Sequence, residues 1–320
     1  MNPNKPRADK RLEGFSRPGV SPGDLPCGVI LFDKGAGMSS HDAVDLVRRL
    51  SGIRRVGQCG TLDPLATGLL LLLVGKATRF FDLLAPLEKE YLVTMQFGAR
   101  STTGDVTGEI LPVGGKAGGK VTETGLRTVL PGFTGMIKQR VPAYSAVKQQ
   151  GVPLYRKARR GQKVIPPVRE VQIHSIGLEG FDASRQQAVL TVRCSKGTYI
   201  RTLCEDIGEA RGTSAYAAGL RRTAVGDLLV ADAATTEELS GLPAGSLLSV
   251  NNSSFLSCLS ALYFLPVREL SATETHAVGH GQAIAGNEQG PVCLVADGKL
   301  LAVYGPRGDE GVIRPMVVMR

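Results

Sequence analysis

One carboxylate in this chain lies in a loop whose neighbours suit the presentation of a side chain. Asp63 is the fourth residue of GTLDPLATG, residues 60–68. The proline that follows it disfavours the helical region, so Asp63 should be extended within a turn. Glycines at both ends of the loop allow sharp bends or a close approach of the backbone to another group. A carboxylate held in this way can serve as a catalytic group. The alternative is an aspartate that only bonds to its own turn.

The segments around this loop are predicted to hold it rigidly. The run LLLLLV, Leu69–Val74, is typical of a buried strand, or less readily of a core helix. Ser39 and Asp42 form a capping box, which predicts a helix from about residue 40 to residue 51 that stops near Gly52.

Further strands and a helix are predicted downstream. Apolar residues alternate with mostly polar ones from Tyr91 to Phe97, which is typical of a half-buried strand, and residues 189–194 predict another. Thr198 can cap a helix that ends before Gly212. The apolar stripe of this helix would comprise Ile200, Leu203, Cys204 and Ile207. The mixture of strands and helices favours an α+β fold.

Composition points to a basic protein with a substantial core. The 320 residues are 42% hydrophobic and carry a formal net charge of +9, with a pI near 9.4. This charge favours a polyanionic partner, with nucleic acid ahead of an acidic membrane surface. The longest apolar run falls far short of the about 20 residues that span a bilayer, so no membrane association is expected. Residues 1–24 lack the apolar core of a secretory signal and are predicted to be a disordered basic tail.

No motif predicts a metal or a cofactor. The six cysteines show no CxxC pair, which fits a reducing cytoplasm. His276 and His280 have the spacing of a shared ligand pair on a helix but lack a ligand-rich partner motif. The glycines at positions 68 and 75 do not have the spacing of a phosphate-binding loop.

One segment concentrates the positive charge. Between Thr124 and Glu170 the chain has ten Lys or Arg residues and no Asp or Glu. These are Arg127, Lys138, Arg140, Lys148, Arg156, Lys157, Arg159, Arg160, Lys163 and Arg169. Tyr144 and Tyr155 lie among them, and cations mixed with aromatic rings suit the backbone and bases of folded RNA. A solvated basic face is the alternative.

Five motifs together resemble one family. The nonapeptide around Asp63 resembles the signature loop of the TruB family of tRNA pseudouridine synthases. Four other segments resemble further motifs of this family and occur in the family's order. They are GVILFDKGAGMSSHDAV (28–44), KEYLV (89–93), CSKGTYIRTLCEDIG (194–208) and GLRRTAVG (219–226).

The resemblance implies roles for three residues in the reaction. Asp63 would be the catalytic carboxylate, and Arg201 would be the cation that keeps its pKa low and holds its geometry. A surface pair between Arg201 and Glu205 is the alternative for this arginine. Tyr91 would stack on the uracil and is a candidate to accept the C5 proton, unless it is only a core aromatic residue of its strand.

The resemblance also implies residues that bind the substrate. Tyr199 and Leu220 match positions near the pocket, and Lys34 matches a lysine that supports the catalytic loop. Lys148, Arg156 and Arg159 fall in a basic loop, about residues 134–165, that would grip RNA. Gln58 stands where bacterial members usually have a histidine that fills the space left by flipped bases. Cys59 and Gly35 replace the usual threonine and proline.

The implied architecture has two domains behind the tail. Residues 25–250 would form a pseudouridine synthase domain with a mixed, largely antiparallel sheet flanked by helices. Residues 251–320 would form a small PUA-like β-barrel that binds RNA, with strands within residues 292–305 and 311–319.

The implied activity is isomerisation of the T-loop uridine of tRNA to pseudouridine on a flipped-out base. No cofactor would be required, the partner would be the T-arm of tRNA, and a cytoplasmic monomer is expected. A basic RNA-binding or RNA-folding factor without turnover is the alternative from another class, and a synthase acting on ribosomal RNA is a second enzymatic alternative. The matched aspartate, tyrosine and arginine together favour the enzyme.

Overall fold

The computed structural model describes most of the chain after residue 25. The described residues are 26–113, 120–145, 147–149, 151–160, 162, 166–243, 245–249, 252–308 and 311–319, with backbone only for Lys148, Pro153, Tyr155, Ala158 and Arg159. The predicted tail, residues 1–24, lies outside these ranges. The sequence PVGGKAGGK, residues 112–120, predicts a flexible surface insertion, and it also lies largely outside these ranges.

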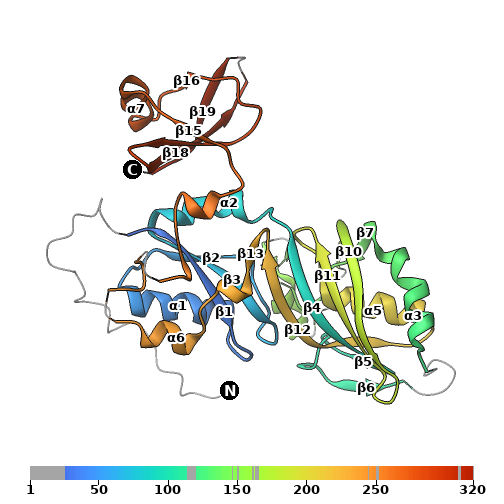
Figure 1. Ribbon diagram of the computed structural model, residues 1–320. Coiled ribbons are helices and arrows are strands. Elements are labelled where there is room, and N and C mark those ends of the chain that lie inside the picture. The colour runs from blue at the N-terminus through green and yellow to red at the C-terminus, as the bar shows by residue number, and fades with distance from the viewer. Residues whose placement is uncertain are drawn as a thin grey trace.

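A ten-stranded sheet forms the body of the protein (Figure 1). Its strand order is β14-β1-β3-β12-β4-β11-β10-β7, with β2 paired to β3 and β13 paired to β12. Neighbouring strands are antiparallel except for β3 and β12, which are parallel. The strands are β1 (Gly28–Lys34), β2 (Val56–Cys59), β3 (Thr67–Val74), β4 (Lys89–Phe97), β7 (Gly135–Arg140), β10 (Val168–Asp182), β11 (Gln187–Cys194), β12 (Ala215–Val225), β13 (Leu228–Leu229) and β14 (Phe255–Ser257). The α+β fold with a mixed, largely antiparallel sheet is confirmed.

Helices flank this sheet and short hairpins extend from it. The α-helices of the body are α1 (Ser40–Ser51), α2 (Phe81–Leu84), α3 (Glu123–Val129), α4 (Leu154–Arg159), α5 (Ile200–Ala210) and α6 (Thr236–Gly241). The 3-10 segments are η1 (Gly75–Phe80), η3 (Leu130–Phe133), η4 (Val230–Asp232) and η5 (Ser260–Leu262). Two small hairpins pair β5 (Ala99–Ser101) with β6 (Ile110–Pro112) and β8 (Lys148–Gln149) with β9 (Val152–Pro153).

The predicted helix over residues 40–51 is confirmed as α1. The Ser39 hydroxyl accepts a hydrogen bond from the Asp42 N–H, and the Asp42 carboxylate accepts one from the Ser39 N–H, so the capping box is complete. Gly52 ends the helix with φ of 71°, a left-handed conformation that favours glycine.

The leucine run is a central strand because both of its faces are buried. Leu69, Leu71 and Leu73 pack into one apolar cluster, with η1 and α2. Leu70 and Leu72 pack into another, with α1 and α6. A strand covered on both faces needs a continuous apolar sequence rather than an alternating one. The strands predicted at residues 91–97 and 189–194 are confirmed as β4 and β11.

The helix that carries Arg201 begins differently from the prediction. Tyr199 is the N-cap residue of α5 and makes no side-chain cap bond. The Thr198 hydroxyl instead donates to the carbonyl of Ser195 at 2.9 Å, within the turn that precedes the helix. The prediction of a Thr198 cap is therefore wrong, because the hydroxyl bonds backwards into its own turn. The predicted apolar stripe is buried, and it packs on β4, β11 and β12.

The C-terminal part of the chain has its own five-stranded sheet, in the order β15-β17-β18-β19-β16. Its elements are β15 (Val267–Glu269), α7 (Ala272–Gly279), β16 (Ile284–Ala285), β17 (Val292–Ala296), β18 (Lys299–Pro306) and β19 (Val312–Val318). The strands expected at 292–305 and 311–319 are confirmed, and the sheet is consistent with a PUA-like β domain. The division at residue 250 stays a prediction; β14, beyond that position, pairs with β1 of the larger sheet.

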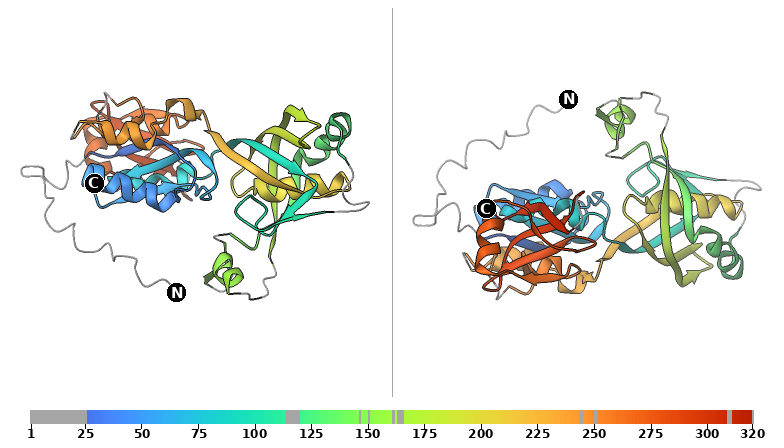
Figure 2. Two further views of the ribbon diagram at one scale, coloured as in Figure 1. Left: turned by 90° about the horizontal axis from the view of Figure 1, so that it is seen from below. Right: turned by 90° about the horizontal axis from the view of Figure 1, so that it is seen from above.

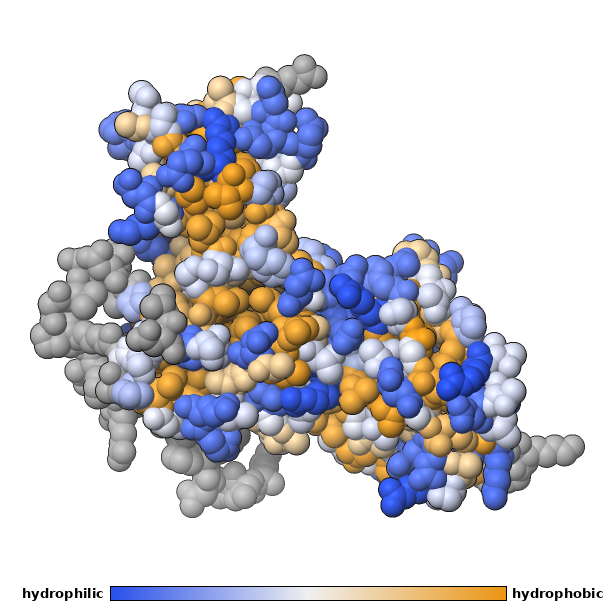
Figure 3. All heavy atoms as spheres, viewed as in Figure 1, coloured by the Kyte–Doolittle hydropathy of each residue, from blue (hydrophilic) through white to orange (hydrophobic). Residues whose placement is uncertain are grey.

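The C-terminal sheet packs directly against the body. Cys293, Val303 and Val317 share an apolar cluster with Phe80 and Leu262. The junction lies beside α2 in Figure 1, and apolar residues gather on both sides of it in Figure 3. The Lys76 ammonium donates to the carbonyl of Met319 at 3.1 Å, which adds a polar tie across the contact.

Gly68 marks a close approach between β3 and β12. Its φ is +97°, and a Cβ added there would lie 2.2 Å from the carbonyl oxygen of Arg222. We expect Gly68→Ala to lower the free energy of unfolding by about 2 to 4 kcal/mol, through backbone strain and overpacking. Urea unfolding measures this change, with Gly35→Ala as control because a Cβ at Gly35 meets nothing within 4 Å. Equal stability of Gly68→Ala and wild type would refute the prediction.

Among the residues that the structure describes, no helix has the length and apolar character needed to cross a membrane.

Candidate active site

A cleft of about 680 Å³ opens beside the loop that carries Asp63. Its walls come from this loop, from α2 and β4, from the turn before α5, and from β12. The cleft therefore lies where β3, β12 and β4 are adjacent in the sheet. Asp63, Tyr91, Tyr199, Arg201 and Leu220 all line it, so five of the predicted site residues meet there.

The Asp63 loop is fastened on both sides of the aspartate. The Ser40 hydroxyl donates to the carbonyl of Leu62 at 2.8 Å and accepts from its N–H at 2.9 Å. The Lys34 ammonium donates to the carbonyls of Met38, at 2.8 Å, and Pro64, at 3.4 Å. Lys34 is fully buried, and burial lowers its pKa to about 8. These contacts hold the loop in one conformation at the mouth of β3.

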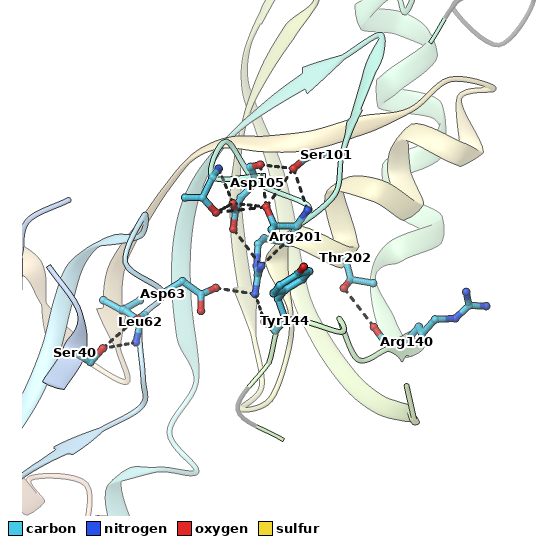
Figure 4. A network of polar contacts seen from close by, with 11 residues as sticks. Ser40, Leu62, Asp63, Ser101, Asp105, Arg140, Tyr144, Arg201 and Thr202 are labelled. Carbon is cyan, nitrogen blue, oxygen red and sulfur yellow. Dashed lines mark hydrogen bonds and ion pairs between the residues drawn. The ribbon is translucent and has the colours of Figure 1, made fainter. Parts of the chain in front are cut away.

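Arg201 faces Asp63 from the first turn of α5 (Figure 4). Its Nη2 lies 3.0 Å from Oδ2 of Asp63 and donates to the carbonyl of Tyr144, also at 3.0 Å. The arginine side chain is only 6% exposed, whereas the Asp63 side chain is 44% exposed. The alternative of a surface pair with Glu205 is therefore excluded. The carboxylate of Asp63 stays open to the cleft while its partner is buried.

A second carboxylate fixes the other end of the arginine. Nη1 of Arg201 lies 3.1 Å from Oδ2 of Asp105 and donates to the carbonyl of Thr103 at 2.7 Å. Oδ1 of Asp105 accepts from the N–H of Thr107 at 2.9 Å and from the Thr103 hydroxyl at 2.8 Å. Asp105 is 3% exposed. A buried carboxylate therefore fixes one end of the guanidinium, and the other end pairs with Asp63.

Burial has a larger effect on the pKa of Asp63 than the Arg201 guanidinium has. Desolvation by the cleft walls raises the pKa of Asp63, Arg201 and Lys34 act to lower it, and Asp105 raises it further. The net direction is upward, so the expectation that Arg201 holds this pKa low is wrong. The arginine offsets part of the desolvation and orients the carboxylate.

Tyr91 forms part of the cleft wall from β4. It packs at the margin of two apolar clusters and also lines the cleft, so it is not only a core aromatic residue of its strand. Burial raises the pKa of its phenol, while the Arg222 guanidinium acts in the opposite direction. A raised pKa keeps the phenol protonated at neutral pH.

Three predicted substrate-binding residues whose side chains the structure describes, Lys34, Gln58 and Arg156, do not line the cleft. Gln58 lies on β2, where its Nε2 donates to the Thr61 hydroxyl at 3.1 Å and its Oε1 is buried without a hydrogen-bond partner among the described residues. Lys148 lies on β8, and Arg156 and Arg159 lie on α4. Both views in Figure 2 show α4 apart from the layers of the sheet. Of these three basic residues, only Arg156 has a described side chain, and it does not reach the cleft that holds Asp63.

Comparison with known proteins decides the family. The family model for the N-terminal domain of TruB family pseudouridylate synthases matches residues 48–200, and the model for the C-terminal domain of tRNA pseudouridylate synthase B matches residues 201–245. The chain is 40% identical over 299 residues to tRNA pseudouridine synthase B of Thermobifida fusca (strain YX). The matched region covers 91% of this chain and 98% of the relative. The chain belongs to the TruB family of pseudouridylate synthases. A relative from Cupriavidus metallidurans with the same name is 41% identical over 303 residues, or 90% and 92% of the two chains.

Solved structures share the fold of this TruB-family chain. A chain in the crystal structure of a Cbf5-Nop10-Gar1 complex superposes with a TM-score of 0.69 at 24% identity and covers 92% of this chain and 86% of its own length. A chain in the crystal structure of an archaeal box H/ACA sRNP Nop10-Cbf5 complex superposes with a TM-score of 0.67 at 22% identity, covering 96% and 93%.

Three residues of the TruB-family site were missed from the sequence. Asp105 carries no local signal of a site, whereas Lys89 begins the KEYLV motif, which could have singled it out. Lys89 lines the cleft with its ammonium bonded to the carbonyls of Ala85 and Leu87, both at 2.6 Å, and burial lowers its pKa to about 8. Arg222 likewise belongs to the GLRRTAVG motif, which could have singled it out. It is 1% exposed and donates to the carbonyl of Gly60 at 2.8 Å, at the start of the Asp63 loop.

Proposed function

We propose that this TruB-family protein isomerises a uridine of tRNA, the one in the T-loop, to pseudouridine, with Asp63 as the catalytic carboxylate. The observation that carries the proposal is the pairing of Asp63, 44% exposed in the cleft, with the buried guanidinium of Arg201 at 3.0 Å. The identity of about 40% to enzymes named tRNA pseudouridine synthase B supports it over most of the chain.

The reaction requires an accessible carboxylate of fixed orientation. The N1 to C1′ bond of uridine breaks, the freed uracil rotates, C5 bonds to C1′, and the C5 proton leaves. Asp63 would attack C1′ of the sugar or C6 of the base, or would assist formation of a glycal. Arg201 binds one oxygen of Asp63 and is itself held by Asp105, so the carboxylate is oriented before substrate arrives.

Extrusion of the base requires a platform inside the cleft. We assign stacking on the uracil to Tyr91, and Leu220 and Tyr199 line the same cleft.

Replacing Tyr91 with phenylalanine separates the two roles of this residue. Stacking survives and the hydroxyl is lost, so we expect Tyr91→Phe to bind a T-arm hairpin within about threefold of wild type. If the hydroxyl takes the C5 proton, the single-turnover rate should fall by about 100-fold or more. Full turnover by Tyr91→Phe would exclude the proton-acceptor assignment. If Tyr91→Phe bound the hairpin more weakly, stacking would not be the main contribution of Tyr91 to binding.

We propose that the basic segment between Thr124 and Glu170 contacts the RNA backbone, with α4 as its outermost part. A variant that neutralises Arg156, Lys157, Arg159 and Arg160 should bind tRNA more weakly at low salt. The slope of log affinity against log salt should flatten by about 0.7 for each lost phosphate contact with single-stranded RNA. Affinity measured at four or more salt concentrations gives the slope, with Arg185→Gln as the control because Arg185 is exposed outside this segment. An unchanged slope would show that these side chains do not contact phosphates.

The remaining assignments concern partners and domains. We propose a cytoplasmic monomer whose partner is the T-arm of tRNA, and a second RNA-binding surface on the PUA-like C-terminal sheet. The domain division into residues 25–250 and 251–320 belongs to this proposal.

Product analysis on defined RNAs tests the function. The wild-type protein should form pseudouridine in an unmodified tRNA transcript and none in a transcript whose T-loop uridine is replaced by cytidine. Product at another uridine would contradict the T-loop assignment, and a preference for a ribosomal RNA fragment would favour the second enzymatic alternative. Tight binding of tRNA without any product would indicate that the protein is an RNA-binding or RNA-folding factor without turnover.

A further inference from the structure

Phe81 is an exposed aromatic residue beside a buried one. Phe80 is fully buried and packs in the cluster beneath β3. Phe81, the first residue of α2, is 46% exposed and belongs to none of the apolar clusters of the described residues. Core packing therefore does not explain this ring, and leaving it in water is unfavourable. An exposed aromatic ring offers a flat face on which a base can stack.

The location of Phe81 connects it to the site. Among the exposed large hydrophobic residues of the described ranges, Phe81 alone lines the cleft that holds Asp63. Its neighbours on that wall are Ala85 and Lys89. The backbone carbonyl of Phe81 accepts from the Cys59 thiol at 3.9 Å, next to the start of the Asp63 loop. The ring thus lies at the side of the cleft formed by α2.

The charge of the cleft indicates the chemistry of its ligand. Among the described residues that line it, five are Lys or Arg and two are Asp or Glu. The cations are Lys89, Arg169, Lys196, Arg201 and Arg222. A cationic wall that includes an exposed aromatic ring suits a polyanion with flat, unstacked bases.

Base extrusion creates the need for such a ring. When one nucleotide leaves a stack, the faces of its neighbours lose their partner, and the protein must replace that contact or leave it to water. Tyr91 is already assigned to the extruded uracil. We propose that Phe81 stacks on a second, unpaired base of the RNA substrate, next in the chain to the extruded uridine. This inference rests on the proposed function, because it takes RNA with a flipped nucleotide as the ligand.

The absence of tryptophan from the chain offers a direct probe. Phe81→Trp introduces a single indole whose emission should be quenched when a base stacks on it. The matched control is Leu229→Trp, because Leu229 is 49% exposed and does not line the cleft. Titration with an unmodified T-arm hairpin should quench the Phe81→Trp emission by at least about half and change the control by less than about a tenth.

Affinity measurements separate stacking from other contributions. Phe81→Ala and Phe81→Leu should each weaken hairpin binding by about 5- to 100-fold, the range that loss of one base–aromatic stack gives. Phe81→Tyr should bind as wild type does. The slope of log affinity against log salt should stay unchanged in all three variants, because no phosphate contact is lost. Melting temperatures near that of wild type are expected, since Phe81 lies outside the core.

Each outcome decides between roles. Binding by Phe81→Leu equal to wild type would overturn the proposal, because apolar volume without an aromatic face would then suffice. Unchanged Phe81→Trp emission at saturating hairpin would also overturn it. A fall in melting temperature shared by the Ala and Leu variants, with Phe81→Trp unquenched, would show a packing role or contact with a protein instead. Quenching in a protein that forms no pseudouridine would support the stack and reject the proposed activity, so the two can fail separately.

Discussion

Asp63→Asn is expected to lower the single-turnover rate of pseudouridine formation by about 10⁴-fold or more, as loss of a group that bonds to the substrate does. Asparagine keeps the shape of the side chain and its hydrogen bond from Arg201, but it has no charge with which to attack C1′ or C6 or to promote a glycal. Binding of tRNA should stay within about threefold of wild type, because cations outnumber acids among the described residues of the cleft.

The same variant should be at least as stable as wild type at neutral pH. Burial raises the pKa of Asp63, so the folded state favours the protonated form. The stability that comes from this preference is present in full below the pKa of the unfolded chain and is lost as pH rises through the higher folded-state pKa. At neutral pH the ionised carboxylate therefore opposes folding. Asparagine removes that charge, and Arg201 keeps its pairing with Asp105.

Melting curves between pH 4 and pH 8 measure this effect. The melting temperature of Asp63→Asn should equal or exceed that of wild type at pH 8, and the difference should shrink toward acid pH. The wild-type rate should fall on the acid side with an apparent pKa above the ordinary aspartate value. Asp45→Asn is the control, because Asp45 pairs with Arg48 on the surface of α1 and does not line the cleft. A melting temperature of Asp63→Asn several degrees below that of wild type would contradict the account of burial.

Arg201→Ala is expected to have the largest effect on stability. This change leaves Asp105, 3% exposed, without the cation that faces it, and it removes the donor to the carbonyls of Thr103 and Tyr144. Removing one partner of a buried ion pair lowers the free energy of unfolding by about 3 to 5 kcal/mol. Turnover should also be lost, because Asp63 is then neither paired nor oriented.

Denaturant unfolding and the single-turnover assay together test Arg201. Arg127→Ala is the matched control, since Arg127 is a helical arginine in an exposed pair with Glu123 at 2.8 Å. That control should lose less than about 1 kcal/mol. If Arg201→Ala were as stable as the control, the buried network would not hold this part of the fold. Wild-type turnover by Arg201→Ala would show that the carboxylate needs no cation.

Local features of the fold were predictable because their causes are close in the chain. The capping box of Ser39 and Asp42 set the start of α1, and Gly52 set its end. The leucine run was recognisable as a buried strand because apolar clusters cover both of its faces, which requires a continuous apolar sequence. The predicted Thr198 cap was wrong because a hydroxyl near the start of a helix can bond forward as a cap or backward into a turn. Only the geometry of the turn determines which bond forms.

Contacts between distant segments account for what the sequence did not reveal. Arg201 meets Asp105 across 96 positions, and Arg222 meets Gly60 across 162, so no spacing rule could pair them. The direction of the Asp63 pKa depends on how far the cleft walls desolvate the carboxylate, which a motif does not encode. Asp63, Tyr91 and Arg201 were found because each lies in a motif that resembles the family. Phe81 lies in none, and only its exposure within the cleft singles it out.

The most direct test of the central claim is the amount and position of pseudouridine formed in one turnover on an unmodified tRNA transcript, by wild type and by Asp63→Asn at equal bound fractions. We expect wild type to form up to one equivalent of pseudouridine at the T-loop uridine, and Asp63→Asn to form none above background. Equal product from the two proteins would contradict the claim, because another group would then perform the chemistry.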